Sequence, residues 1–233
     1  MRIAVIGTGM VGRILAAKLA EVGHEVTIGT RDVEATLARS EPDRLGTPPF
    51  SQWQGEHPDI GLATMPDAVD GAELVVNATA GRVSLEAFRS IGAERLDGKI
   101  LLDVAQPLDL SQGMPPTLTV VNTDSLAEQL QREFPGAKVV KSLNTTYAEV
   151  MVDPARVPGR HNIFVAGDDD DAKRVVRGVL GEFGWPADRV IDLGDITGAR
   201  GAEMFARMYF TLAGALGTFD LNIAVHAKDQ KEQ

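Results

Sequence analysis

Short apolar runs alternate with amphipathic segments along the first two thirds of the chain. A short apolar run bounded by turn residues is typical of a buried strand, and apolar residues that recur every three or four positions are typical of a helix. The pattern predicts strands over residues 3–6, 25–29, 60–63, 74–77, 99–103 and 139–143. It predicts helices over residues 11–22, 33–38, 65–70, 84–91 and 126–134. Such alternation predicts an α/β fold, a Rossmann-type doubly wound parallel sheet with helices on both faces.

The last third of the chain continues the alternation and then changes. Two more strands are predicted over residues 162–166 and 190–193, with a helix over residues 168–181 between them. Residues 198–227 form a long, largely apolar segment with large side chains at helical spacing, which we expect to face the core or a subunit interface. The sequence therefore predicts a small C-terminal α/β extension that ends in a long helical segment.

Residues 41–59 interrupt the alternation with a turn-rich stretch that contains four prolines. We predict a long irregular loop here, of the kind that is often a functional rim or an insertion. Phe50 and Trp53 lie within it and favour its docking against the body of the protein.

The first predicted strand runs directly into a G-x-G-x-x-G turn at Gly7, Gly9 and Gly12, and an amphipathic helix follows. In such a turn the first glycine permits a tight bend, the second lets the backbone approach a phosphate, and the third lets the helix pack close to the strand. The N-terminus of the helix adds free N–H groups and the positive end of its dipole. The motif therefore predicts a dinucleotide ligand.

The end of the second predicted strand indicates which dinucleotide. Thr30 and Arg31 follow that strand, where an NAD-binding unit places a carboxylate for the ribose hydroxyls. A hydroxyl and a guanidinium suit the 2′-phosphate of NADP, because arginine is always charged and binds phosphate through two N–H groups. Asp32 leaves two roles open, a contact with the ribose or the N-cap of the next helix.

Three other strand ends carry small or polar residues, over residues 77–81, 103–108 and 142–145. Because ligands of parallel sheets bind beyond the carboxyl ends of the strands, we expect these residues to line the cofactor cleft. We assign no catalytic residue, since neither a Ser-His-Asp order nor a Tyr-x-x-x-Lys pair is present, and Lys141 is expected to be a surface charge. Hydride transfer between two stacked planar rings requires orientation and exclusion of water rather than a proton shuttle.

Composition narrows the classes of partner. The formal net charge is −10, which argues against nucleic acid and anionic membrane surfaces, and no apolar stretch approaches the ~20 residues of a membrane span. The absence of cysteine excludes disulfides and thiolate sites and suggests a cytoplasmic location. The four histidines are scattered, and residues 168–171 are aspartates at a predicted helix start, where the helix dipole and water satisfy them. No metal site is expected.

Five stretches together resemble the family of NADPH-dependent coenzyme F420 reductases, the deazaflavin:NADP oxidoreductases. They are RIAVIGTG at residues 2–9, GHEVTIGTR at 23–31, KVVKSLNT at 138–145, AGDDD at 166–170 and DLGDIT at 192–197. The resemblance covers nearly the whole chain. It implies an oxidoreductase that transfers a hydride between NADP(H) and the deazaflavin coenzyme F420, usually as a homodimer. It also implies an NADP-binding Rossmann domain over residues 1–150 and a small C-terminal domain over residues 151–233 that closes the cleft and contributes to the dimer.

The resemblance assigns residues to the cofactor. It implies pyrophosphate contacts from Thr8, Gly9, Met10 and Val11, within the turn of Gly7 and Gly12, and 2′-phosphate contacts from Thr30 and Arg31. It places Ala78, Thr79, Gly81 and Leu108 beside the cofactor and Ala148 near the nicotinamide. Many relatives have asparagine where this chain has Met10, and Tyr147 stands where smaller residues are expected.

Two other functions stay open from the sequence. One is an NADPH-dependent reductase of a flavin, a ferric chelate or a small carbonyl or imine compound; the cytosolic domain of the metalloreductases, which shares this fold, reduces a flavin with NADPH. The other is a non-catalytic NADP(H)-binding sensor. The carbonyl case requires a proton donor, and no side chain stands out for that role.

Overall fold

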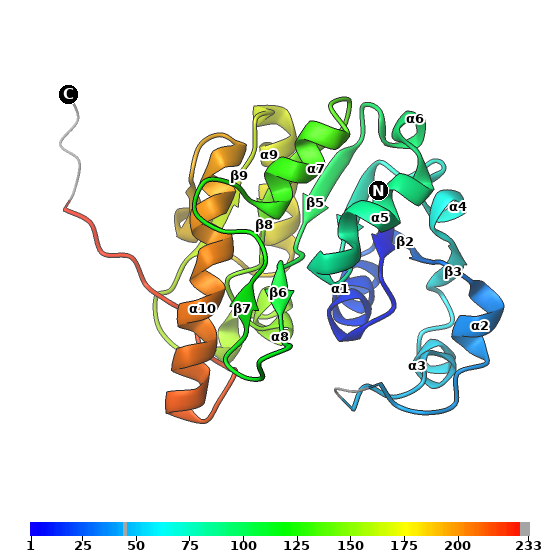
Figure 1. Cartoon of the computed structure of the whole chain (residues 1–233), viewed down its shortest axis with the longest axis horizontal. Helices are drawn as coiled ribbons and strands as arrows, with labels where there is room; N and C mark the ends of the chain where they lie inside the picture. The colour runs from blue at the N-terminus through cyan, green and yellow to red at the C-terminus, as the bar shows by residue number, and fades with distance from the viewer. Residues whose placement is uncertain (44–45, 229–233) are drawn as a thin grey trace.

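The computed structural model describes residues 1–43 and 46–228, and these form one mixed eight-stranded sheet with helices on both faces (Figure 1). The strand order is β10-β9-β8-β5-β4-β1-β2-β3. The strands of this sheet are β1 (Arg2–Ile6), β2 (Glu25–Thr30), β3 (Gly61–Thr64), β4 (Leu74–Asn77), β5 (Ile100–Asp103), β8 (Lys138–Ser142), β9 (Ile163–Ala166) and β10 (Val190–Asp192). The order of β3, β2, β1, β4 and β5 is that of a Rossmann unit, which confirms the predicted fold class.

Two hydrophobic cores lie on the two faces of the sheet. One face packs against α1 (Met10–Glu21), α3 (Phe50–Glu56), α8 (Ala148–Val152) and α9 (Asp170–Glu182). The other packs against α4 (Met65–Val69), α5 (Gly81–Ile91), α6 (Ala93–Leu96), α7 (Leu126–Glu133) and the start of α10 (Ala199–Leu216). Outside these layers lie α2 (Val33–Leu37) and a small hairpin of β6 (Leu108–Asp109) and β7 (Thr117–Leu118), which are joined by residues 110–116.

The sheet is parallel from β3 to β8, but β9 runs antiparallel to β8, with Lys141 opposite Ala166. The predicted parallel sheet therefore holds from β3 to β8, and the antiparallel pair lies where the C-terminal extension joins it. A parallel strand requires a crossover that returns the chain to the other end of the sheet. The connection between β8 and β9 holds only the short helix α8 and a 3-10 turn, so β9 starts at the end of the sheet where β8 finishes.

β9 and β10 extend the same sheet as the strands of the N-terminal part, and β10 is parallel to β9. The C-terminal α/β extension is therefore continuous with the Rossmann sheet. The division into domains at residue 150 stays a prediction.

Residues 46–59 of the predicted irregular loop contain helix α3, so the loop prediction is wrong there. Phe50 is 3% exposed and belongs to the core beside α1, and Trp53 packs against that core. The rings of Phe50 and Trp53 lie 5.3 Å apart at their centroids. The expectation that these aromatic residues dock the segment against the body is confirmed.

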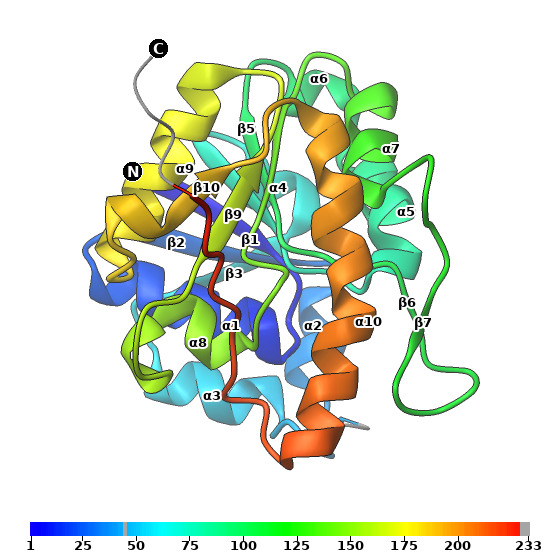
Figure 2. The same cartoon turned by 90° about the vertical axis from the view of Figure 1, so that its left-hand side faces the viewer.

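Helix α10 ends at Leu216, earlier than the predicted 198–227 segment. Gly217 adopts φ +67°, the left-handed conformation that commonly ends a helix, and its N–H bonds to the Ala213 carbonyl. The chain then returns beside β9 (Figure 2), where the N–H of Asn162 donates to the Ile223 carbonyl at 2.9 Å. The buried side chains of α10 are mostly alanines, whereas Met208 and Leu216 are 55% and 64% exposed.

Candidate functional site

A pocket of about 1100 Å³ lies beyond the carboxyl ends of β1, β2 and β4. The glycine turn, the β2–α2 connection, the first residues of α4 and one side of α5 form its walls. Parallel strands with helices on both faces leave a crevice where the chain connections from neighbouring strands diverge, here at β1 and β4. The pocket occupies that crevice.

The geometry at the three motif glycines is compatible with the roles that their spacing predicts. Gly7 adopts φ +131°, and a Cβ there would lie 2.5 Å from the carbonyl oxygen of Ala78. A Cβ on Gly12 would lie 2.1 Å from the carbonyl oxygen of Gly7, so only glycine lets α1 pack this close to the turn. No atom lies within 4 Å of the Cβ position of Gly9, which lines the pocket. The backbone at Gly9 is therefore open to a ligand.

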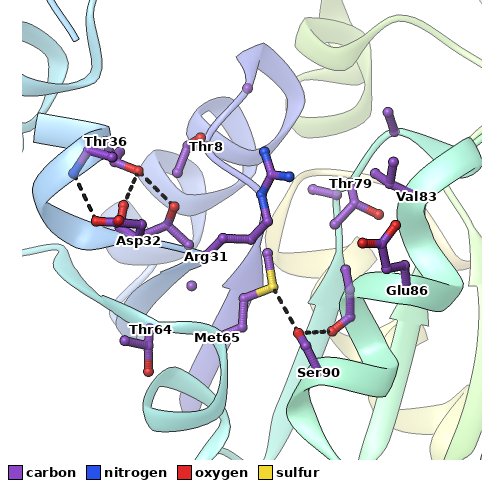
Figure 3. Close-up of a pocket in the computed structure, with 18 of the residues that line it drawn as sticks. Thr8, Arg31, Asp32, Thr36, Thr64, Met65, Thr79, Val83, Glu86 and Ser90 are labelled. Atoms are coloured by element: carbon purple, nitrogen blue, oxygen red, sulfur yellow. Dashed lines mark hydrogen bonds between the residues drawn. The ribbon is translucent and has the colours of Figure 1, made fainter. Parts of the chain in front are cut away.

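Three arginines line the pocket without a partner. Arg31 follows β2, Arg39 follows α2, and Arg82 is the second residue of α5. None of them has an ion pair or a hydrogen bond within residues 1–43 and 46–228. Figure 3 shows the Arg31 side chain reaching from the end of β2 towards the space between Thr8 and Thr79. In a protein with a net charge of −10, three guanidinium groups with no partner among the described residues outnumber the two carboxylates of the pocket, Asp32 and Glu86, and favour an anionic ligand.

Asp32 caps α2, since its Oδ1 accepts a hydrogen bond from the Ala35 N–H at 2.9 Å. This settles its geometry in favour of the N-cap role, one of the two roles left open by the sequence. Beside it, the Thr36 hydroxyl donates to the Asp32 carbonyl at 2.7 Å, and the hydroxyls of Thr30 and Thr36 are 2.7 Å apart. Because Thr36 donates its hydrogen to Asp32, Thr30 is the donor in the bond between the two hydroxyls, and it would have to release Thr36 in order to donate to a phosphate.

Seven of the predicted site residues line this pocket, and they are Gly7, Thr8, Gly9, Thr30, Arg31, Ala78 and Thr79. The other six do not line it, and they are Met10, Val11, Gly12, Gly81, Leu108 and Ala148. A Cβ on Gly81 would lie 2.2 Å from the Gln106 carbonyl oxygen, and Ala148 is 2% exposed in the core. Packing therefore explains Gly12 and Gly81, and a cofactor contact for any of these residues stays a prediction.

Among the pocket residues that the sequence reasoning missed are two arginines, Arg39 and Arg82. Arg82 gave a usable signal, since it directly follows the strand end at residues 77–81; the helix was predicted only from residue 84, whereas α5 begins at Gly81 and includes Arg82. Arg39 lies in the segment after α2, where no pattern distinguishes it from a solvated surface charge.

Lys141 is fully buried, so its expected position on the surface is wrong. Its Nζ lies 2.9 Å from Asp103 Oδ2 and 2.9 Å from Glu203 Oε1, and it donates to the Ala105 carbonyl. Burial alone would lower the pKa of Lys141, but the two carboxylates outweigh it and raise that pKa. All three N–H donors are occupied, so Lys141 has none left for a substrate.

Glu203 ties α10 to α7 within this buried cluster. Its carboxylate accepts the N–H groups of Leu126 and Ala127, at 2.8 and 3.1 Å, at the start of α7. Burial raises the pKa of Glu203, and Lys141 acts in the opposite direction. The cluster of Asp103, Lys141 and Glu203, which we call the buried ion cluster, therefore fastens β5, β8, α7 and α10 together.

Hydrogen bonds connect the buried ion cluster to the pocket wall. Thr79 Oγ1 donates to Asn77 Oδ1 at 2.7 Å, and Asn77 Nδ2 donates to Asp103 Oδ1 at 2.8 Å. The polar side chains at these strand ends thus bind one another. In the part of the chain that the structure describes, this leaves Thr79 as the member of the network that lines the pocket.

Among residues 1–43 and 46–228, no group of three or more His, Asp or Glu side chains could hold a metal ion. At the predicted aspartate cluster, Asp169 caps α9 by accepting the Ala172 N–H at 2.8 Å. No helix in the described ranges is both long enough and apolar enough to span a bilayer.

Comparison with known proteins identifies the family. The profile described as NADP oxidoreductase coenzyme F420-dependent matches residues 2–107. The solved structure of a candidate F420-dependent NADP reductase from Arthrobacter sp. FB24 is 58% identical, covers 97% of this chain and 100% of its own, and superposes with a TM-score of 0.92. The chain belongs to the F420-dependent NADP oxidoreductase family. This confirms the predicted resemblance and, at the level of the family, the prediction of an NADP-dependent oxidoreductase whose substrates are NADP and coenzyme F420.

Two curated relatives extend the comparison. The F420-dependent NADP reductase of Methanothermobacter marburgensis is 28% identical over 218 residues, which are 91% of this chain and 92% of the relative. The metalloreductase STEAP3 of Rattus norvegicus is 25% identical over 202 residues, and the match spans 36% of that longer protein. The chain thus matches the reductase along almost its whole length and the metalloreductase along about a third.

Proposed function

We propose that this protein transfers a hydride between NADP(H) and coenzyme F420. The observation that carries the proposal is the pocket itself, in which an open glycine turn faces three arginines that have no partner among the described residues. The volume of about 1100 Å³ leaves room for a dinucleotide, and the absence of any atom near the Cβ position of Gly9 leaves the backbone free to meet phosphate. The residues present therefore fit NADP(H).

In this proposal each wall of the pocket has a task. The turn from Gly7 to Gly12 and the first turn of α1, including Met10 and Val11, hold the pyrophosphate through backbone N–H groups and the helix dipole. Thr30 and Arg31 hold the 2′-phosphate. Ala78, Thr79 and Gly81 flank the cofactor, with Leu108 and Ala148 nearer the nicotinamide. Bound NADP(H) supplies the nicotinamide carbon that gives or accepts the hydride.

The locked strand ends support hydride transfer between two rings over reduction of a carbonyl. At these strand ends, Asp103 accepts hydrogen bonds from both Asn77 and Lys141. A carbonyl or imine substrate requires a positioned proton donor, whereas transfer between two planar cofactors requires alignment and exclusion of water. The arrangement of these side chains therefore favours a planar redox cofactor, such as a deazaflavin, over a carbonyl or imine as the second substrate.

The test is to mix the purified protein with NADPH and oxidised coenzyme F420 and to follow the visible absorption of the deazaflavin. The proposal expects that this absorption disappears at a rate proportional to protein concentration. Flavin mononucleotide and a ferric chelate serve as competing acceptors. If NADPH binds and one of those acceptors is reduced while the deazaflavin absorption stays unchanged, that acceptor class and not F420 is the substrate. If NADPH binds but no acceptor is reduced, the protein is a sensor.

We also infer a homodimer in which residues 151–233 close the cleft and supply the contact. The support is the apolar outer side of α10, where Met204, Met208 and Leu216 are 36%, 55% and 64% exposed. Scattered single apolar residues are normal on a surface, but several along one helix are typical of an interface. Light scattering should give twice the mass of the chain, and Met208→Lys should shift the mass towards one chain. A cytoplasmic location stays a prediction.

A further inference from the structure

Arg13 lies directly behind the glycine turn and is 8% exposed. It follows Gly12 on α1 and does not line the large pocket. Its Nε donates to the Thr8 carbonyl at 2.8 Å, and its Nη1 donates to the Pro48 carbonyl at 2.6 Å. Its guanidinium carbon lies 5.2 Å from the centroid of the Phe50 ring. One side chain therefore connects the turn to the segment that precedes α3.

The bond to Thr8 fixes the direction of a peptide group. In a planar trans peptide the C=O and the N–H point in opposite directions. The carbonyl of Thr8 and the N–H of Gly9 belong to the same peptide, so holding that carbonyl against Arg13 turns the Gly9 N–H away from Arg13. Thr8 and Gly9 both line the pocket, whereas Arg13 does not. Arg13 thus aims a backbone donor at the place where an anion is expected.

The second arm of Arg13 has a rigid support. Pro48 precedes α3, and Phe50 is 3% exposed in the core that also contains α1. A guanidinium over an aromatic face is attracted by the negative face of the ring. Burial lowers the pKa of Arg13, with Asp43 acting in the opposite direction, and arginine keeps its charge under such burial. The segment of Pro48 and Phe50 therefore holds the guanidinium in one orientation.

We propose that Arg13 is a positioning residue for the pyrophosphate of NADP(H), and that the segment around Pro48 and Phe50 is its brace. This rests on the proposed function, in which the pocket takes NADP(H). Arg13 acts through the Thr8–Gly9 peptide and does not touch the cofactor. The inserted segment between β2 and β3 thereby contributes to cofactor affinity from behind the turn.

The test compares two ligands that share one end. NADPH contains the pyrophosphate and the 2′-phosphate, whereas adenosine 2′-monophosphate contains only the latter. Arg13→Met removes both hydrogen bonds and keeps an apolar side chain over Phe50. We expect the dissociation constant of NADPH to rise about tenfold or more, because one aimed hydrogen bond to a charged group is lost, while that of adenosine 2′-monophosphate changes less than about twofold. Isothermal titration calorimetry measures both.

Arg200→Met is the matched control. Arg200 is another arginine with two hydrogen bonds, both to Glu128, and it lies outside the pocket. NADPH affinity should be unchanged in this variant. Arg13→Lys keeps the charge and reaches one carbonyl, so it should restore part of the NADPH affinity, and it carries the same two-ligand comparison if Arg13→Met fails to fold.

Three results distinguish the positioning role of Arg13 from the proposed binding of NADP(H). Equal NADPH affinity in wild type and Arg13→Met overturns the positioning role alone. An equal loss for both ligands also overturns it, because that is the result of a general loss of structure. If the wild-type protein binds neither ligand, the proposed function is wrong, and the role of Arg13 falls with it.

Discussion

Positive side chains serve opposite purposes in two regions of this molecule. At the pocket, Arg31 and Arg82 are exposed and have no partner among the described residues, whereas Lys141 is buried between Asp103 and Glu203. Water solvates an exposed cation at little cost, so it stays available to a ligand. A buried cation requires partners that occupy all its N–H donors, so it has none left to bind a ligand. In this protein, burial therefore distinguishes Lys141, whose charge is structural, from Arg31 and Arg82, whose charges are available to a ligand.

The largest expected effect comes from breaking the buried region. Lys141→Met leaves two buried carboxylates without their cation and should lower the free energy of unfolding by about 3–5 kcal/mol. Lys138→Met is the control on the same strand, since Lys138 pairs with Asp169 at 2.9 Å but its side chain is 41% exposed. Lys138→Met should lower the free energy of unfolding by at most about 1 kcal/mol. Urea denaturation followed by circular dichroism measures both, and similar losses for the two variants would contradict the comparison.

The next effect concerns the pocket. Arg31→Ala should weaken NADPH binding about 10- to 100-fold, because a charged hydrogen-bond partner of the 2′-phosphate is lost. The melting temperature should stay within experimental error, since Arg31 has no partner in the described structure to lose. Fluorescence titration with NADPH and NADH provides the measurement. An equal loss for the two cofactors would show that Arg31 does not bind the 2′-phosphate.

A smaller effect is expected from the other two pocket arginines. Arg39→Ala and Arg82→Ala should each weaken NADPH binding about threefold to fivefold, and added salt should reduce the difference, because these exposed charges act through solvent. Arg174→Ala is the control, since Arg174 is exposed on α9 and pairs with Asp171 at 2.7 Å. If Arg174→Ala lowers NADPH affinity as much as the pocket variants do, the effect comes from the net charge of the protein and not from the pocket.

The smallest effect is a pH dependence at a paired surface carboxylate. Hydrogen bonds from Arg132 lower the pKa of Asp124 from its usual 3.8 to about 2. A lowered folded-state pKa stabilises the protein at pH above 3.8, and the contribution disappears as the pH falls from 3.8 towards 2. Asp124→Asn should therefore lower the melting temperature at pH 6 and have little effect near pH 2. A constant difference across this range would contradict the pairing.

Local pattern sufficed for much of the fold and for one wall of the site. The spacing of Gly7, Gly9 and Gly12 defined the turn, because a bend, a close approach and a tight helix contact are demands of adjacent residues. The cap at Asp32 and the pocket position of Arg31 likewise follow from their place at the end of β2. These features depend on neighbours within a few positions of the chain.

The direction of β9 was beyond such reasoning, because it depends on where the connection over residues 143–162 packs against the sheet. The helix at Phe50 was missed because prolines around it are typical of loops, and its stability comes from packing against α1 rather than from helix propensity. Arg39 belongs to the pocket only because the chain folds around that space. Contacts between distant segments leave no periodic signal.

The sequence by itself determined the Rossmann fold class, the nucleotide-binding turn and the position of Arg31 at the end of β2. The tertiary structure alone decided that Lys141 is buried between Asp103 and Glu203 and that Arg13 braces the turn against Pro48. The physical reason is that the desolvation of a charge, and the partners that offset it, are set by segments remote in the chain. Positive residues of the same types therefore stand exposed at the pocket, behind the glycine turn or inside the buried ion cluster, according to what the fold places around them.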